Sequence, residues 1–151
     1  MRKRTQSREY ALQILYQHEM NPQTIEELMD SFWNVNPNAT DEVRIFAYRL
    51  VSRTLTNLEA IDAAIAKAMD HWELTRVVIL DKNIMRMAVC ELLYFADVPP
   101  KVALNEAVNL AKKFSQEESG KFVNGVLDKI SHSEPFNLKN FKGPVPELGT
   151  G

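Results

Sequence analysis

The chain has 151 residues, of which 45% are hydrophobic and 25% are charged, and its net charge at pH 7 is −2. This length is typical of one domain with a sizeable core, and the charge balance excludes a protein that is basic over its whole surface. No apolar run approaches the ~18–20 residues of a membrane span, and no apolar stretch of signal-peptide type follows the basic N-terminus. We therefore expect a cytoplasmic protein without a membrane segment.

Four cations and no acid lie in the first eight residues: Arg2, Lys3, Arg4 and Arg8. A helix is predicted to begin at Thr5 or Ser7 and to end near Met20. Cations at a helix N-terminus are unfavourable by a few tenths of a kcal/mol each, and Arg4 and Arg8 repel because they are four residues apart. Local stability does not account for this cluster, whereas an anionic partner would, because arginines bind phosphate and the N-terminal amides add donors. The alternative is a disordered basic tail.

Three more helices are predicted before residue 70. Thr24 and Glu27 form a capping box, which opens a helix that ends near Trp33. Thr40 is the expected cap of the next helix, and a break near Asn57 separates it from the fourth. Three arginines of the third helix are predicted to form a solvated face: Arg44, Arg49 and Arg53.

Residues 75–96 form the most apolar segment of the chain. A helix that is apolar on nearly all sides is predicted to be the central one of a bundle. Arg86 within it needs an acidic partner or a route to solvent, and Glu91 and Glu106 are the candidates. Cys90 is the only cysteine, so it cannot form an internal disulfide, and it is predicted to be a small buried hydrophobe.

Two amphipathic helices are predicted to meet at residues 114–116. Their apolar positions recur at helical spacing, at Leu104, Ala107, Val108, Ala111 and Phe114 in the first and at Phe122, Val123, Val126, Leu127 and Ile130 in the second. Ser115 followed by Glu118 predicts a capping box at the start of the second helix. Since the pattern fades after residue 131, we predict one all-α domain of about seven helices over residues 1–131 and a flexible tail over residues 132–151.

One flank of the last helix combines side chains that suit a nucleotide. Glu118, Lys121, Phe122 and Gly125 lie at i, i+3, i+4 and i+7. An aromatic ring beside a cation is the arrangement on which a base stacks. Glycine in a helix interior is unfavourable by ~1 kcal/mol, which suggests close approach of another molecule. The alternative is a ring in the core, a capping glutamate, a solvated lysine and a glycine at a contact between packed helices.

No pattern in the chain predicts catalysis. There is no nucleophile elbow, no glycine loop that would hold phosphate and no evident pair of catalytic carboxylates. The three histidines lie in separate segments without the spacing of metal ligands. The sequence therefore predicts a binding protein, with no metal and no cofactor.

Three stretches of the chain resemble the NusB family of transcription antitermination factors: DVPPKVALNEAVNLAKKFSQEESGKFVNGVLDKI, the preceding ELLY, and SREYALQILYQ near the N-terminus. The resemblance spans roughly residues 4–130. It implies an all-α fold of two small helical groups. It also implies binding of single-stranded boxA RNA, as found in the leaders of ribosomal RNA operons, together with the ribosomal protein NusE in the RNA polymerase antitermination complex.

The resemblance further implies which residues contact RNA. They are the N-terminal Arg2, Lys3, Arg4 and Arg8, and the residues Glu118, Lys121 and Phe122 at the start of the last helix. It assigns no residue to the contact with NusE. Two alternatives remain at this stage: a helical module that binds only protein, and the RNA-binding domain of a ribosomal RNA methyltransferase. The second needs a cofactor-binding sheet, for which this chain is too short.

Overall fold

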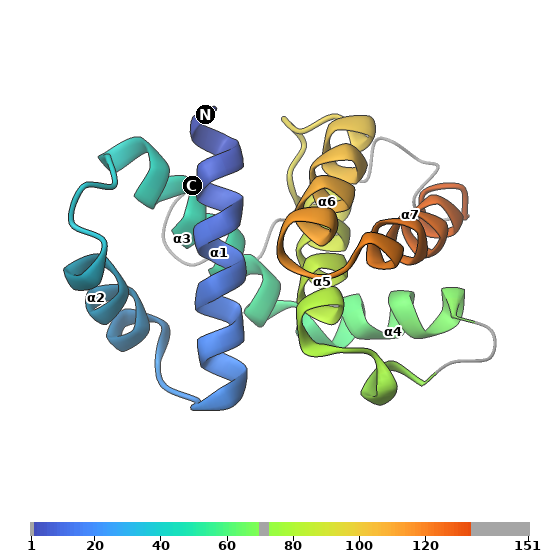
Figure 1. Ribbon diagram of the computed structural model, residues 1–151, viewed down its shortest axis with the longest axis horizontal. Coiled ribbons are helices and arrows are strands. Elements are labelled where there is room, and N and C mark those ends of the chain that lie inside the picture. The colour runs from blue at the N-terminus through green and yellow to red at the C-terminus, as the bar shows by residue number, and fades with distance from the viewer. Residues whose placement is uncertain (1, 70–72, 134–151) are drawn as a thin grey trace.

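The computed structural model describes residues 2–69 and 73–133, and within these ranges the chain is helical, with no strand. The described helices are α1 (Lys3–Met20), α2 (Ile25–Val35), α3 (Asp41–Thr56), α4 (Leu58–Ala68), the short 3-10 helix η1 (Leu74–Arg76), α5 (Ile79–Tyr94), α6 (Pro100–Phe114) and α7 (Glu117–Ser131). Figure 1 shows them in two groups, with α1 to α3 on one side and α4 to α7 on the other. The predicted all-α class is confirmed, and the described residues form seven α-helices, in line with the prediction of about seven.

Two of the predicted helix starts are confirmed by their caps. The Thr24 hydroxyl accepts a hydrogen bond from the Glu27 amide at 3.1 Å, and the Glu27 carboxylate accepts one from the Thr24 amide at 3.2 Å. At the start of α3, the Thr40 hydroxyl accepts from the Val43 amide at 3.3 Å. These side chains satisfy amides that have no partner inside the helix, so short sequence patterns fix where α2 and α3 begin.

Helix α5 is the central helix, as predicted. It packs against α1, α3 and α4 as well as against α6 and α7. Ile84, Met85, Val89 and Cys90 on it are all fully buried. Burial raises the pKa of the Cys90 thiol to about 12, so this cysteine stays protonated and acts as a small hydrophobe, as its position in the sequence indicates.

The partners predicted for Arg86 are wrong. Its guanidinium forms a two-pronged ion pair with Asp62 of α4 at 2.7 and 2.8 Å and also contacts Glu19 of α1 at 3.2 Å. Glu91 and Glu106, the expected partners, pair with a different arginine described below. Arg86 lies on the side of α5 that faces α1 and α4. Helix periodicity does not predict which acids other helices place on that side.

The three arginines of α3 do not form a solvated face. Arg53 is buried and donates to the carbonyl of Tyr94, the last residue of α5, at 3.0 Å. Arg44 donates to the carbonyls of Ala39 and Pro37 at 3.0 and 3.1 Å, and the half-buried Arg49 lies 5.1 Å from the centre of the Phe95 ring. The end of a helix leaves carbonyls without partners, and the α5 end supplies such an acceptor to α3.

The predicted capping box at Ser115 is absent. Ser115 is the C-cap of α6, where its amide bonds to the Ala111 carbonyl, and the N-cap of α7 is Gln116, which makes no side-chain cap hydrogen bond. The Ser115 hydroxyl instead lies 3.0 Å from the Ser119 hydroxyl, which donates to the buried Asp81 of α5 at 2.9 Å. A chain of side-chain hydrogen bonds therefore holds the first turn of α7 against the first turn of α5.

The predicted tail over residues 132–151 lies outside the described residues from position 134 onward, and the proposed limits of the domain stay a prediction. None of the described helices is both long enough and apolar enough to cross a membrane.

Candidate nucleic-acid interface

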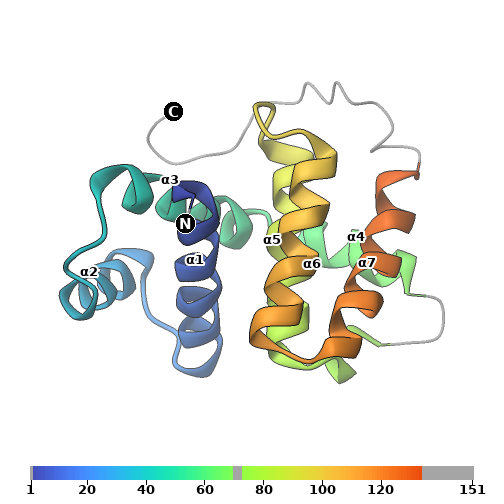
Figure 2. The same ribbon diagram turned by 45° about the horizontal axis from the view of Figure 1, so that its top comes forward.

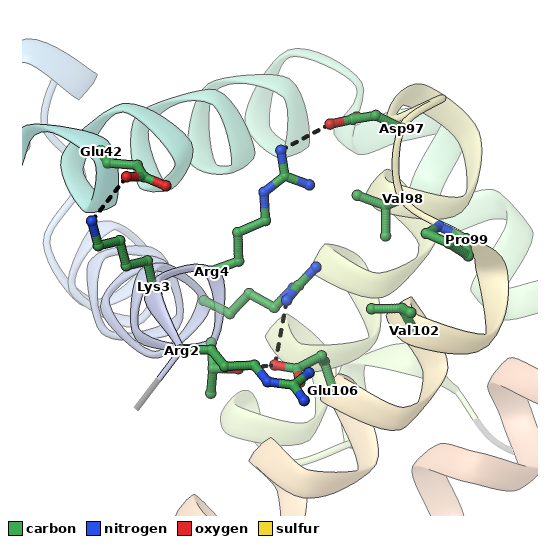
Figure 3. A pocket seen from close by; sticks show the side chains of 11 residues that line it. Arg2, Lys3, Arg4, Glu42, Asp97, Val98, Pro99, Val102 and Glu106 are labelled. Carbon is green, nitrogen blue, oxygen red and sulfur yellow. Dashed lines mark hydrogen bonds and ion pairs between the residues drawn. The ribbon is translucent and has the colours of Figure 1, made fainter.

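The basic residues at the start of α1 line an open cleft of about 510 Å³ (Figure 3). Its other walls come from the first turn of α3, the turn between α5 and α6, and the first two turns of α6. The lining residues are Arg2, Lys3, Arg4, Thr5, Arg8, Glu42, Asp97, Val98, Pro99, Val102 and Glu106. Lys3, Arg4 and Arg8 therefore belong to an ordered helix, with Arg2 at its N-cap, and not to a disordered tail.

Two of these cations pair with exposed acids that also line the cleft. The Lys3 ammonium lies 3.0 Å from the Glu42 carboxylate, and the Arg4 guanidinium lies 2.9 Å from that of Asp97. Arg4 also lies over the Phe46 ring, 4.4 Å from its centre. Partial burial would raise the pKa of Asp97, and the hydrogen bond and charge of Arg4 outweigh this and lower it.

Arg8 is placed differently from the other three cations. It is 3% exposed and donates two hydrogen bonds of 2.8 Å to the equally buried Glu91 of α5. Its third contact is Glu106 of α6 at 3.3 Å, which also accepts a hydrogen bond of 2.9 Å from Thr5. The guanidinium predicted to contact RNA is thus enclosed by protein, which the sequence could not reveal because it does not show which way α1 faces.

These contacts explain the unfavourable charge at the start of α1. Burial raises the pKa of Glu91, and the hydrogen bonds and charge of Arg8 oppose that rise by favouring the carboxylate. Opposite charges from α3, α5, α6 and the α5–α6 turn surround the cations. An outside anion is therefore not needed to account for the cluster. Repulsion within one helix is visible in the sequence, whereas the acids that other helices contribute are not.

The second group of predicted residues lies at the start of α7. Glu118 and Lys121 are exposed, and Phe122 is half-buried with its ring packed against the edge of the core. Gly125 is exposed, and a Cβ atom added there would have no described atom within 4 Å. The fold itself therefore does not require glycine at this position, which leaves room for another molecule to lie close to the helix.

The two groups do not share one pocket, since α6 lies between α1 and α7 in both views (Figures 1 and 2). The exposed face of α6 connects them. Val102 lines the cleft beside α1, and Asn105 and Asn109 follow it on the same exposed face. Lys112 ends the row and packs on Gly120 of α7, where an added Cβ would lie 2.9 Å from its Cγ. The sequence did not predict these residues as part of a site. Their spacing shows only that they lie on the solvent-exposed side of a helix, and most such positions have no binding role.

The arrangement can bind an extended anion. Cations can neutralise phosphates at one end, the side-chain amides of Asn105 and Asn109 can form hydrogen bonds, and the half-buried ring beside Lys121 can stack on a base. Among the described residues, no three side chains of His, Cys, Asp or Glu are close enough together to hold a metal ion.

The fold and this surface define an all-helical protein of two packed helix groups with a surface suited to an anionic polymer. Comparison with known proteins identifies the family. The chain belongs to the NusB family, whose model matches residues 5–132. The family resemblance found in the sequence is thereby confirmed.

Among its relatives is the transcription antitermination protein NusB of Chloroherpeton thalassium, which is 38% identical over 98% of this chain and 68% of the relative. The protein of the same name from Thermodesulfovibrio yellowstonii is 40% identical over 91% of this chain and 97% of its own length. A solved structure of the antitermination factors NusB and NusE in complex with double-stranded RNA contains a similar chain, with a TM-score of 0.78 at 29% identity, covering 86% of this chain and 96% of that one. NusB of T. maritima has a TM-score of 0.77 at 31% identity, with 87% and 91% covered.

Proposed function

We propose that this protein is a transcription antitermination factor that binds boxA-type RNA together with the ribosomal protein NusE. It would act in the cytoplasm as part of the RNA polymerase antitermination complex. The observation that carries the proposal is the continuous surface from the cation cluster on α1, across α6, to the Lys121–Phe122 flank of α7. Relatives named as antitermination proteins, and a similar chain solved with NusE and double-stranded RNA, support it.

In the proposed complex, Arg2, Lys3 and Arg4 neutralise RNA phosphates. All three side chains are exposed at the mouth of the cleft. Arginine offers a planar set of donors that matches phosphate oxygens, and lysine supplies a point charge. Phosphate contacts fix where the RNA lies, although they do not read its sequence.

The side chains at the α7 end of the surface contact the RNA bases in this proposal. A base can stack on the Phe122 ring, and Lys121 can contact the phosphate next to it. Glu118 can accept hydrogen bonds from base amino groups, and the open space beside Gly125 allows a nucleotide to approach the helix backbone. These contacts suit unpaired bases, whose edges and faces are accessible.

Arg8 has a supporting part in this proposal. Its ion pairs with Glu91 and Glu106 fix the start of α1 against α5 and α6. Arg8 thus positions Arg4, one helical turn earlier, without contacting RNA. The protein makes and breaks no bond in this role, because RNA and NusE together recruit it to the polymerase complex.

The proposal is tested by measuring the binding of fluorescently labelled RNA with and without purified NusE. The RNAs are a single-stranded boxA element from a ribosomal RNA leader, a scrambled strand of the same composition and a boxA duplex. We expect the boxA strand to bind more tightly than the scrambled strand and NusE to strengthen the binding. Binding of NusE that no RNA alters would instead identify a purely protein-binding module. Tighter binding of the duplex would show that base stacking on Phe122 is not the mode of recognition.

A further inference from the structure

The cation cluster on α1 is already neutralised by acids of the same chain. Lys3 pairs with Glu42, Arg4 pairs with Asp97, and Arg8 pairs with Glu91 and Glu106. Within the described residues, Arg2 is the one member of the cluster for which no ion pair is found. Four cations thus face four carboxylates, and the cleft has no large excess of positive charge to offer an RNA.

The ion pairs fall into two kinds that differ in exposure. The side chains of Arg8 and Glu91 are 4% and 3% exposed, so this pair is closed to a ligand. Those of Lys3 and Glu42 are 57% and 67% exposed, and those of Arg4 and Asp97 are 45% and 51% exposed. An exposed pair is weak and open to exchange, because water and salt screen it. An incoming phosphate can therefore take over Lys3 and Arg4 while Arg8 keeps its partners.

The two exposed acids stand at the mouth of the cleft. Glu42 belongs to the first turn of α3, and Asp97 belongs to the turn between α5 and α6. Figure 3 shows them on opposite sides of the cleft, each joined to its cation. Each carboxylate therefore has two effects on an RNA at this place: it occupies a cation that phosphate would contact, and it repels the phosphate.

We propose that Glu42 and Asp97 set the affinity of the cleft for RNA, as internal counterions that RNA phosphate must displace from Lys3 and Arg4. This inference rests on the proposed function. Lys3 and Arg4 raise the affinity for RNA, and the two acids that contact them lower it. RNA that meets only the cleft then binds weakly, and stable binding needs the additional contacts at α7 or from NusE. The acids thus favour the complete complex over loose association with any RNA.

The test is a gain of affinity, which structural damage does not produce. Glu42→Gln and Asp97→Asn keep the size and polarity of the side chains and remove their charge. We expect each to strengthen boxA RNA binding about two- to fivefold, the range that the strength of an exposed ion pair implies. The two together should give about tenfold, since the two acids act on different cations. The gain should shrink as salt is raised.

Two controls make the same charge change elsewhere. Asp30→Asn on α2 and Glu59→Gln on α4 alter exposed acids outside the cleft, and they should change RNA affinity by less than the cleft variants. Equal gains in the controls would show a general effect of net charge and overturn the inference. A loss of affinity in Asp97→Asn would also overturn it, because the acids would then be holding the cations in place for RNA.

If wild type binds and the cleft variants do not bind more tightly, the inference fails and the proposed function stands. If wild type and the double variant both fail to bind any RNA, both fail.

Discussion

Arg8→Ala is expected to lower the free energy of unfolding by about 3–5 kcal/mol, the loss found when one partner of a buried ion pair is removed. The substitution leaves Glu91 enclosed by α1 and α5 without the two hydrogen bonds of 2.8 Å that it accepts from Arg8. Burial already raises the pKa of Glu91, and without Arg8 only the charge of Arg4 still opposes that rise. The loss of stability should therefore be largest at neutral pH and shrink as the pH falls and Glu91 takes up a proton.

Denaturant unfolding of wild type, Arg8→Ala and Arg4→Ala measures this effect. Arg4 forms an exposed pair with Asp97, so its removal should change the free energy of unfolding by no more than about 1 kcal/mol. The double variant Arg8→Met/Glu91→Leu should recover much of the loss, because apolar side chains can replace a buried pair. If Arg8→Ala is no less stable than Arg4→Ala, the pair does not hold α1 in place, and Arg8 regains its place among candidates for direct RNA contact.

Phe122→Ala is expected to weaken RNA binding by about 1–3 kcal/mol, the contribution of one base stacked on an aromatic ring. The ring is half-buried at the edge of the core. Its removal should therefore lower the free energy of unfolding by less than the ~3–5 kcal/mol of a fully buried phenylalanine.

Val126→Ala on the same helix is the matched control. Val126 faces the core and is 7% exposed, so its truncation should cost roughly 2 kcal/mol of folding free energy, from about 0.8 kcal/mol per buried CH₂ group and the space left behind. RNA affinity per folded molecule should hardly change. Both quantities are measured for both variants at a temperature where each is folded. Should Phe122→Ala unfold the protein as readily as a core truncation and leave RNA affinity unchanged, the ring is part of the core alone.

The sequence predicted those features of the fold that depend on neighbouring residues. The capping box of Thr24 and Glu27 and the cap at Thr40 each lie within four residues of chain, and both are present. The central position of α5 follows from its apolar composition. The box at Ser115 failed because the same residue had to end α6, and the local pattern does not show which of the two helices uses it.

The sequence could not predict which charged residues pair across helices. Glu91 and Glu106 were the candidate partners of Arg86, and both pair with Arg8 instead, because periodicity gives the face of each helix and not the angle between helices. Helix α1 begins at Lys3, before the predicted start at Thr5 or Ser7, and so includes Lys3 and Arg4 with their unfavourable charges. Acids on other helices offset those charges. In the candidate site, the sequence indicated the exposed flank of α7, but it gave no sign that α6 joins that flank to the cleft.

The central claim, that RNA phosphates lie on the start of α1, is tested most directly by the salt dependence of RNA binding. Wild type is compared with Arg2→Ala/Lys3→Ala/Arg4→Ala over a range of salt concentrations, with Phe122→Ala as the variant that should leave the slope unchanged. For a single strand, each phosphate that the protein no longer neutralises reduces the slope of log affinity against log salt by about 0.7, so the triple variant should have a slope smaller by up to about 2. A triple variant that is folded and keeps the wild-type slope would show that these residues do not contact phosphate.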